Sequence, residues 1–446
     1  MIMQHILDQI RDKADAGELF MTKANTRSIT YESGKIKDYN TKSNRGYAIR
    51  LVKNGKLGFS YGNDLSKIGN VLENALLACK FSGEKAYPLA ETAAVPEIPA
   101  AIFNKQVAEL SPEAMIEVNE KLCAGLRNYD PQLLPDSEVS KSISEIELHT
   151  TGGFSSSYKS AAWGAGVGAT IVQPEDIYQW GSSTSSLTDD LDVEALLQRA
   201  IKDIELGRNV VPSISGRLPV VFSPHFVSQL YEILEEGIKG SEIFLKNSPL
   251  ADKLDTPIFD DRITILEDPL ACGLQGFNPF DHEGTIVCKK PIVDSGILKR
   301  FYLTRKFAAK LNMDPSGNGF RQKPRSSSIS ADVQPMVTRN TITINPGDLS
   351  LDDMLADIKE GVYCEYSPNL TFGNVITGDF SGSLGMCYKI ENGKRIGRMK
   401  DLTISGNLYD LLTNQVVALS RETMAHDFAP TFESPHFYMR DVTITG

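Results

Sequence analysis

The sequence lacks the long apolar runs and the paired cysteines that define several protein classes. No stretch approaches about 18 consecutive apolar residues, so we expect no membrane-spanning helix. The N-terminal residues show no basic stretch followed by an apolar one, so we expect no signal peptide. The six cysteines are far apart and form no C-x-x-C pair, which favours reduced thiols over a disulfide framework. These absences predict a cytoplasmic protein with no membrane contact.

Known cofactor and nucleophile motifs are also missing. The sequence contains no G-x-x-x-x-G-K-[ST] loop, no G-x-S-x-G elbow and no H-E-x-x-H pair, and none of its six histidines is four residues from another. Three glycines alternate at 164, 166 and 168, but a strand-like Ala-Thr-Ile-Val follows them where a nucleotide-binding loop would open a helix. We therefore predict no cofactor and no metal, and interpret 164–168 as part of a tightly packed strand.

The composition is that of a soluble globular protein with an acidic balance. Among 446 residues, 46 are basic and 57 acidic, which gives a net charge of −11, and 41% are hydrophobic. This apolar fraction excludes a disordered chain. The acidic balance argues against direct nucleic-acid binding, which usually requires a basic face. The length allows about three domains.

The patterns along the chain predict an α+β fold in three units and a linker. Residues 1–85 read as an N-terminal α+β domain in which two helices pack on short antiparallel strands, with a hairpin at Asn54-Gly55. Residues 86–110 are rich in proline and alanine and read as a linker. Residues 111–215 read as a helix, strands and a helix, and 216–446 as a large β-rich C-terminal domain. Within the last unit, Ser223-Pro224 predicts a helix over 224–238.

Two polar regions are candidates for function. Asp281, His282 and Glu283 occupy a turn before an apolar strand, and paired carboxylates beside a histidine can perform acid–base chemistry, with Asp379 as a further candidate. A basic stretch, which includes Arg305 and Arg321, runs into a Gly- and Ser-rich loop at 314–330 whose role the sequence leaves open.

The order of short motifs carries more information than any one of them. In the N-terminal part the motifs are Glu32–Lys35, Arg45–Arg50 and Gly58–Phe59. In the C-terminal part they are Phe280–Thr285, Asp294–Leu298, Tyr302–Arg305, Ser316–Gly319, Gly361–Tyr363, Thr377–Ser381, Ile390–Lys394 and Thr403–Asn407. This succession resembles the TldD/PmbA family, also called modulators of DNA gyrase, over essentially the whole chain.

The resemblance implies a pair of related chains. TldD-type subunits carry a zinc site with an H-E-x-x-x-H helix and act as peptidases on peptides or unfolded proteins, whereas PmbA/TldE-type subunits lack these ligands and complete a heterodimer. The corresponding segment of the helix at 224–238 reads Tyr231–Glu236, and in no register of this helix do two histidines appear. Tyrosine and glutamate do not replace two imidazoles at a zinc hydrolase site. No catalytic residue of the family carries over, so the chain resembles the PmbA/TldE branch.

Three hypotheses follow. The favoured one is a non-catalytic partner of a TldD-like zinc peptidase, forming a heterodimer with it or a homodimer in isolation, and holding a peptide substrate. For this role we name as candidate substrate-binding residues Asp281, His282, Glu283, Asp379 and Asn407. The alternatives are a stand-alone hydrolase that uses the region of Asp281, His282 and Glu283, and a protein-binding regulator of DNA gyrase.

Overall fold

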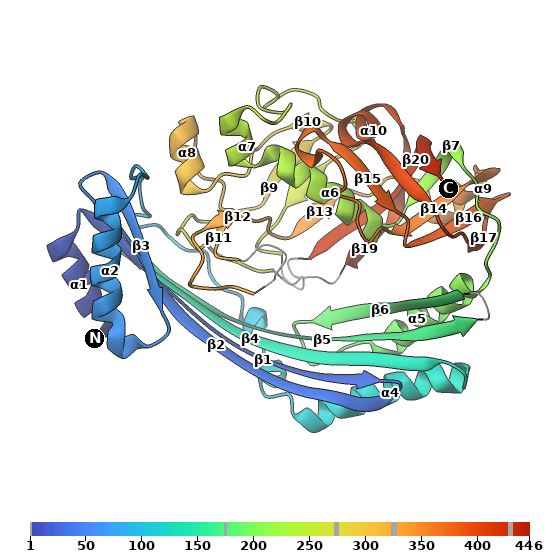
Figure 1. The fold of residues 1–446 in the computed structure, drawn as a ribbon, viewed down its shortest axis with the longest axis horizontal. Helices are drawn as coiled ribbons and strands as arrows, with labels where there is room; N and C mark the ends of the chain where they lie inside the picture. The colour runs from blue at the N-terminus through green and yellow to red at the C-terminus, as the bar shows by residue number, and fades with distance from the viewer. Residues whose placement is uncertain (1, 174–175, 272–275, 323–327, 427–430) are drawn as a thin grey trace.

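The chain forms two layers, a long curved sheet and a C-terminal domain that lies over the concave face of this sheet (Figure 1). The computed structural model describes residues 2–173, 176–271, 276–322, 328–426 and 431–446. Its antiparallel N-terminal sheet, its flanking helices and its strand-rich C-terminal region confirm the predicted α+β class.

The N-terminal sheet has six antiparallel strands in the order β3-β2-β1-β4-β5-β6. Their bounds are β1 Ala16–Glu32, β2 Lys35–Lys53, β3 Lys56–Gly62, β4 Leu134–Thr150, β5 Ser155–Gln173 and β6 Asp176–Ser186. The predicted hairpin at Asn54-Gly55 is confirmed between β2 and β3, where both residues have positive φ, 52° and 71°. The alternating glycines at 164–168 lie within β5, as predicted.

Strands β1 and β4 pair along their length, from Glu18 opposite Thr150 to Tyr31 opposite Ser137. The units predicted at 1–85 and 111–215 therefore contribute to one sheet, and the division into domains stays a prediction. Between them, the segment 86–110 contains η2 (Ala100–Phe103) and α3 (Lys105–Ala108). Leu89 and Ala90 of this segment are buried, so part of the predicted linker packs against the protein.

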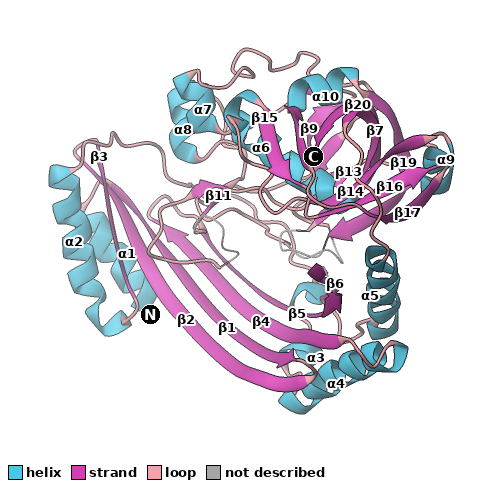
Figure 2. Cartoon of the chain, turned by 45° about the vertical axis from the view of Figure 1, so that its right-hand side comes forward, coloured by secondary structure: helices cyan, strands magenta, loops and turns pink. Residues whose placement is uncertain are grey.

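Helices cover the convex face of the sheet. Successive side chains of a strand point to opposite faces, and the apolar side chains that point to the convex face pack against these helices. Leu19 and Ile49 pack with α1 (Ile2–Lys13) and α2 (Ile68–Phe81), which follows η1 (Leu65–Lys67). At the other end, Ile29 and Val139 share a core with α4 (Pro112–Tyr129) and α5 (Val193–Arg208). Figure 2 shows α1 and α2 at one end of the sheet and α4 at the other, with the C-terminal domain on the opposite side. The concave face is thus left for contact with the C-terminal domain.

The C-terminal domain is built on a mixed twelve-stranded sheet, which agrees with the β-rich unit predicted at 216–446. Its main path runs β10-β9-β8-β13-β20-β7-β14-β16-β17, and β15, β18 and β19 pair beside it. The bounds are β7 Gly216–Phe222, β8 Ile265–Glu267, β9 Lys290–Asp294, β10 Ile297–Leu298, β13 Ile342–Ile344, β14 Glu360–Tyr366, β15 Asp379–Ser383, β16 Met386–Glu391, β17 Lys394–Arg398, β18 Thr403–Asn407, β19 Val416–His426 and β20 Phe432–Thr445. A separate ribbon pairs β11 (Gly319–Phe320) with β12 (Met336–Val337).

The helices of this domain are short, except for α6. They are α6 Pro224–Ile238, α7 Gly240–Leu245, α8 Arg305–Leu311, η3 Val375–Thr377, α9 Leu351–Ala356 and α10 Leu408–Asn414. Helix α6 has the bounds predicted from the sequence, because Oγ of Ser223 accepts a hydrogen bond from N of Phe226 at 3.1 Å and Pro224 occupies the first turn.

None of the helices in the described part of the chain combines the length and apolar character needed to cross a membrane. The five cysteines among the described residues are free thiols. Cys272 lies outside the described residues, as do residues 323–327 of the Gly- and Ser-rich loop at 314–330.

Candidate functional site

A cavity of about 760 Å³ separates the concave face of the six-stranded sheet from the C-terminal domain. Its sheet wall consists mainly of small and hydroxyl-bearing side chains, and its opposite wall includes Asn278, Phe320, Thr338 and Arg339. On the sheet the lining residues include Thr22, Ala24, Thr26, Ser140, Ser142, Ser144, Ser160, Ala162, Gly164, Gly166, Ser183, Thr184 and Ser185. Small side chains leave room for an extended ligand, and hydroxyl groups both donate and accept hydrogen bonds.

The two walls of the cavity meet in a direct hydrogen bond. The hydroxyl of Tyr158, on β5, donates to Oδ1 of Asn278 at 2.8 Å. Tyr158 and Phe280 also belong to a buried cluster that includes Phe20 and Ile146 from the concave face. The cavity is therefore bounded by a packed interface between the two layers.

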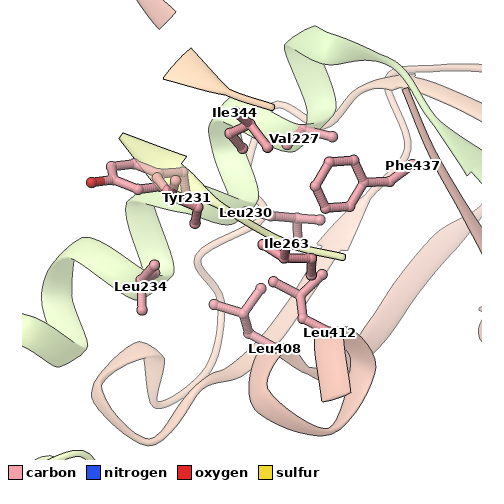
Figure 3. A pocket seen from close by; sticks show the side chains of 10 residues that line it. Val227, Leu230, Tyr231, Leu234, Ile263, Ile344, Leu408, Leu412 and Phe437 are labelled. Atoms are coloured by element: carbon pink, nitrogen blue, oxygen red, sulfur yellow. The ribbon is translucent and has the colours of Figure 1, made fainter. Parts of the chain in front are cut away.

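A much smaller cavity in the C-terminal domain is a packing void rather than a site. It measures about 20 Å³, lies against the inner face of α6 and is lined by apolar side chains such as Val227, Leu230 and Phe437 (Figure 3). This volume is close to that of one water molecule, and an apolar lining gives water no partners.

Helix α6 presents a different set of groups to the region of Arg339. Tyr231 is buried, and its hydroxyl lies 2.5 Å from the hydroxyl of Tyr302. Nη1 of Arg339 donates to Oε2 of Glu235 at 3.2 Å, and the guanidinium carbon is 6.0 Å from the centre of the Tyr231 ring. Nζ of Lys239 pairs with Oε1 of Glu236 at 2.5 Å.

These groups do not fit a zinc ion. Zinc sites use deprotonated Cys, neutral His and carboxylate ligands that converge on one point. Throughout the described residues, no group of three or more such side chains is placed to hold a metal ion. On α6 the Tyr231 hydroxyl contacts another tyrosine, and Glu235 and Glu236 each pair with a cation. A guanidinium beside the helix would in addition repel a divalent cation.

The predicted candidates Asp281, His282 and Glu283 are buried, with 0%, 0% and 1% of their surfaces exposed, and they are not among the residues that line the cavity. Oδ1 of Asp281 accepts hydrogen bonds from the backbone N–H groups of Glu283 and Thr285, and Oδ2 accepts one from Gly319. Burial nevertheless raises the pKa of Asp281 to about 7. Through its three hydrogen bonds to backbone N–H groups, the Asp281 carboxyl group shapes the turn that carries His282 and Glu283.

His282 is enclosed by aromatic rings. The centroids of Phe20 and Phe320 lie 4.9 Å and 5.0 Å from that of its imidazole, and its Nδ1 accepts a hydrogen bond from the backbone N–H of Arg321 at 2.9 Å. Burial, together with the Arg321 charge, lowers the pKa of His282 to about 3. The imidazole is therefore neutral near pH 7.

Glu283 belongs to an ionic network that joins the two layers. Its Oε1 accepts from Nη1 of Arg50 at 2.8 Å, and Glu18 accepts from Nη2 of Arg50 and from Nη2 of Arg321, both at 2.6 Å. Glu283 also accepts from the backbone N–H of Arg305 through Oε2, at 2.7 Å. We call Glu18, Arg50, Glu283 and Arg321 the interlayer network. All four side chains are buried.

Asp379 and Asn407 form a separate pair on β15 and β18. Nδ2 of Asn407 donates to Oδ1 of Asp379 at 2.9 Å, and Oδ1 of Asn407 accepts from the backbone N–H of Tyr409 and so caps α10. The hydrogen bonds from Asn407 and Thr377 lower the pKa of Asp379. Among the described residues, no hydrogen bond joins this pair to Asp281, His282 or Glu283. A role of these five residues in substrate binding stays a prediction.

Sequence reasoning missed the residues that carry most of this geometry. Arg321, which we placed in a basic stretch, is fully buried in the interlayer network, and Arg305 begins α8. Glu18 and Arg339 were not singled out at all. The sequence analysis named Glu283 and Arg321 for other roles, and it placed Arg50 in the motif Arg45–Arg50, whose alternating pattern indicates a strand but not its partner.

Comparisons with known proteins agree with this architecture. The model of the PmbA/TldA metallopeptidase C-terminal domain matches residues 215–446, and that of PmbA/TldA metallopeptidase domain 1 matches residues 17–79. A metalloprotease of Methanothermobacter thermautotrophicus is 26% identical, over 92% of this chain and 89% of its own length. The metalloprotease PmbA of Escherichia coli O157:H7 is 24% identical, over 92% and 88%.

The crystal structure of TldE from Thermococcus kodakarensis superposes on the whole chain with a TM-score of 0.90, at 22% identity and with all of both chains covered. This likeness concerns the fold. The C-terminal family model alone spans more than half of the sequence. Fold, motif order and family models agree, and the chain belongs to the PmbA/TldD family.

Proposed function

We propose that this chain is a non-catalytic, PmbA/TldE-like subunit of a TldD-type zinc metallopeptidase complex that acts on peptides or unfolded proteins in the cytoplasm. The observation that carries the proposal is the composition of α6. In place of converging zinc ligands, this helix has a tyrosine bonded to Tyr302 and glutamates paired with Arg339 and Lys239. The zinc and the attacking water would then come from the partner subunit.

The cavity supports a role in holding the substrate. Its wall of small hydroxyl-bearing residues offers hydrogen bonds along an extended chain. An unfolded segment exposes its backbone N–H and C=O groups, which such a wall can satisfy. A folded domain has already paired these groups. The cavity therefore favours peptides and unfolded proteins over folded ones.

A stand-alone hydrolase centred on Asp281, His282 and Glu283 has less support. These side chains are buried, and they hold the turn and the interlayer network together. A role as a regulator of DNA gyrase gains no support from the geometry described above.

The test is to purify the chain alone and together with a TldD-like chain from the same organism. Zinc is counted by elemental mass spectrometry, and hydrolysis is followed with an unfolded, fluorescently labelled protein. We expect the chain alone to hold no stoichiometric zinc and to hydrolyse nothing, and the complex to hold zinc and to be active. About one zinc per isolated chain, together with hydrolysis that a chelator abolishes, would overturn the proposal.

A further inference from the structure

The large cavity has one wall formed by the C-terminal domain. Among the described residues that line this wall, Arg339 is the basic one. It follows β12, and its side chain is 17% exposed. The Tyr231 ring lies 6.0 Å from the guanidinium carbon, and Glu235 accepts a single hydrogen bond of 3.2 Å from Nη1. The contact between Arg339 and Glu235 is thus a single hydrogen bond, whereas a guanidinium and a carboxylate can form two parallel ones.

Most of the donors of Arg339 are left without a protein partner in the described residues. A guanidinium has five N–H groups, and the hydrogen bond to Glu235 uses one of them. The Nε atom is buried and has no hydrogen-bond partner in the described part of the chain. A ligand cannot reach this enclosed atom, but Nη2 is neither enclosed nor hydrogen-bonded within the described residues, so a ligand in the cavity can supply acceptors to it.

Arg339 stays positively charged in the folded protein. Burial lowers its pKa, but the Glu235 and Glu232 carboxylates more than offset this, so that the pKa lies above the ordinary value for arginine. Two lysines also line the cavity, on the sheet wall. Nζ of Lys141 donates to the carbonyl oxygens of Ala108 and Leu110 at 2.9 Å and 2.6 Å, and Lys42 is exposed on β2. Arg339 therefore combines a permanent charge with unused, partly desolvated donors.

We propose that Arg339 is a specificity-determining residue that binds a carboxylate of the peptide held in the cavity. The planar guanidinium fork matches two carboxylate oxygens, which a neutral backbone carbonyl does not offer. The carboxylate is either the C-terminus of the peptide or an acidic side chain within it. This inference rests on the proposed function, because it requires that peptides enter the cavity.

The experiment uses the full chain and three fluorescent peptides of one sequence. The first has a free C-terminal carboxylate, the second is amidated, and the third is amidated and carries one internal glutamate in place of a glutamine. Fluorescence anisotropy near neutral pH gives the dissociation constants. We expect at least one carboxylate peptide to bind about tenfold tighter than the neutral one, and the tighter of the two identifies the source of the carboxylate.

Variants separate the fork from the general charge of the cavity. Arg339→Gln should remove the tenfold preference, and Arg339→Lys should reduce it because the charge stays while the fork is lost. Glu235→Gln should increase the preference, since it removes the competing carboxylate. Lys42→Gln, which also removes one positive charge from the cavity lining, is the matched control and should leave the preference unchanged.

The outcomes are distinct. Equal binding of all three peptides by the wild type, or a preference that persists in Arg339→Gln, would overturn the carboxylate site and leave the proposed function in place. No binding of any peptide would overturn both the carboxylate site and the proposed role of the cavity in holding the substrate. If Arg339→Gln does not fold, as judged by circular dichroism, the double variant Glu235→Gln/Arg339→Gln removes both charges of the pair and takes its place.

Discussion

Replacing Glu18 by glutamine tests the interlayer network at its centre. The Glu18 carboxylate accepts two hydrogen bonds of 2.6 Å, one from Arg50 and one from Arg321, and none of the three side chains is exposed. A hydrogen bond to a charged group contributes about 1.5–3 kcal/mol, and breaking a buried ion pair costs about 3–5 kcal/mol. Glutamine keeps one acceptor oxygen but no charge. We therefore expect Glu18→Gln to lower the free energy of unfolding by about 3–5 kcal/mol.

Urea unfolding followed by tryptophan fluorescence measures this loss, because both tryptophans, Trp163 and Trp180, lie on the six-stranded sheet. The matched control is Glu145→Gln on the same sheet. Glu145 pairs with Lys159 at 3.0 Å, but these side chains are 29% and 54% exposed, so we expect a loss below about 1 kcal/mol. A Glu18→Gln variant as stable as Glu145→Gln would refute the reasoning that the network holds the layers together.

Two further predictions concern a titrating group and a close contact. Burial and the Arg321 charge lower the pKa of His282 in the folded protein to about 3, from the usual 6.5. Between these two pH values, only the unfolded chain binds the proton. The wild type therefore loses stability as the pH falls, by up to about 1.4 kcal/mol per pH unit. His282→Gln should remove this contribution, and identical pH slopes of the urea midpoints for both proteins would contradict it. Gly58→Ala should lower the melting temperature, because the new Cβ would lie 2.1 Å from the carbonyl oxygen of Ala75 in α2, and overpacking costs about 1–3 kcal/mol. Gly69→Ala on α2 itself has open space and should be neutral or stabilising, so equal melting temperatures for these two variants would count against the close-contact argument.

Local sequence signals predicted the elements that short-range chemistry controls. Helix α6 begins and ends where the Ser223-Pro224 cap and the apolar periodicity place it, and the β2–β3 turn lies at Asn54-Gly55 because these residues accept positive φ. The long strands were predicted only in fragments. Residues 35–45 of β2 are exposed throughout, so they carry no alternation of apolar and polar side chains that could reveal a strand.

By itself, the sequence determined the α+β class, the caps and turns, and the absence of a histidine pair on α6, because each of these depends on residues close together in the chain. The tertiary structure alone decided what the charged groups do. Glu283 reads as part of a polar turn, yet it is buried because Arg50, 233 positions earlier, supplies the compensating charge. Arg339 likewise reads as an ordinary surface arginine until the fold places it beside Glu235 and the large cavity. Burial of a charge requires a partner from a distant segment, and only the folded chain brings the two together.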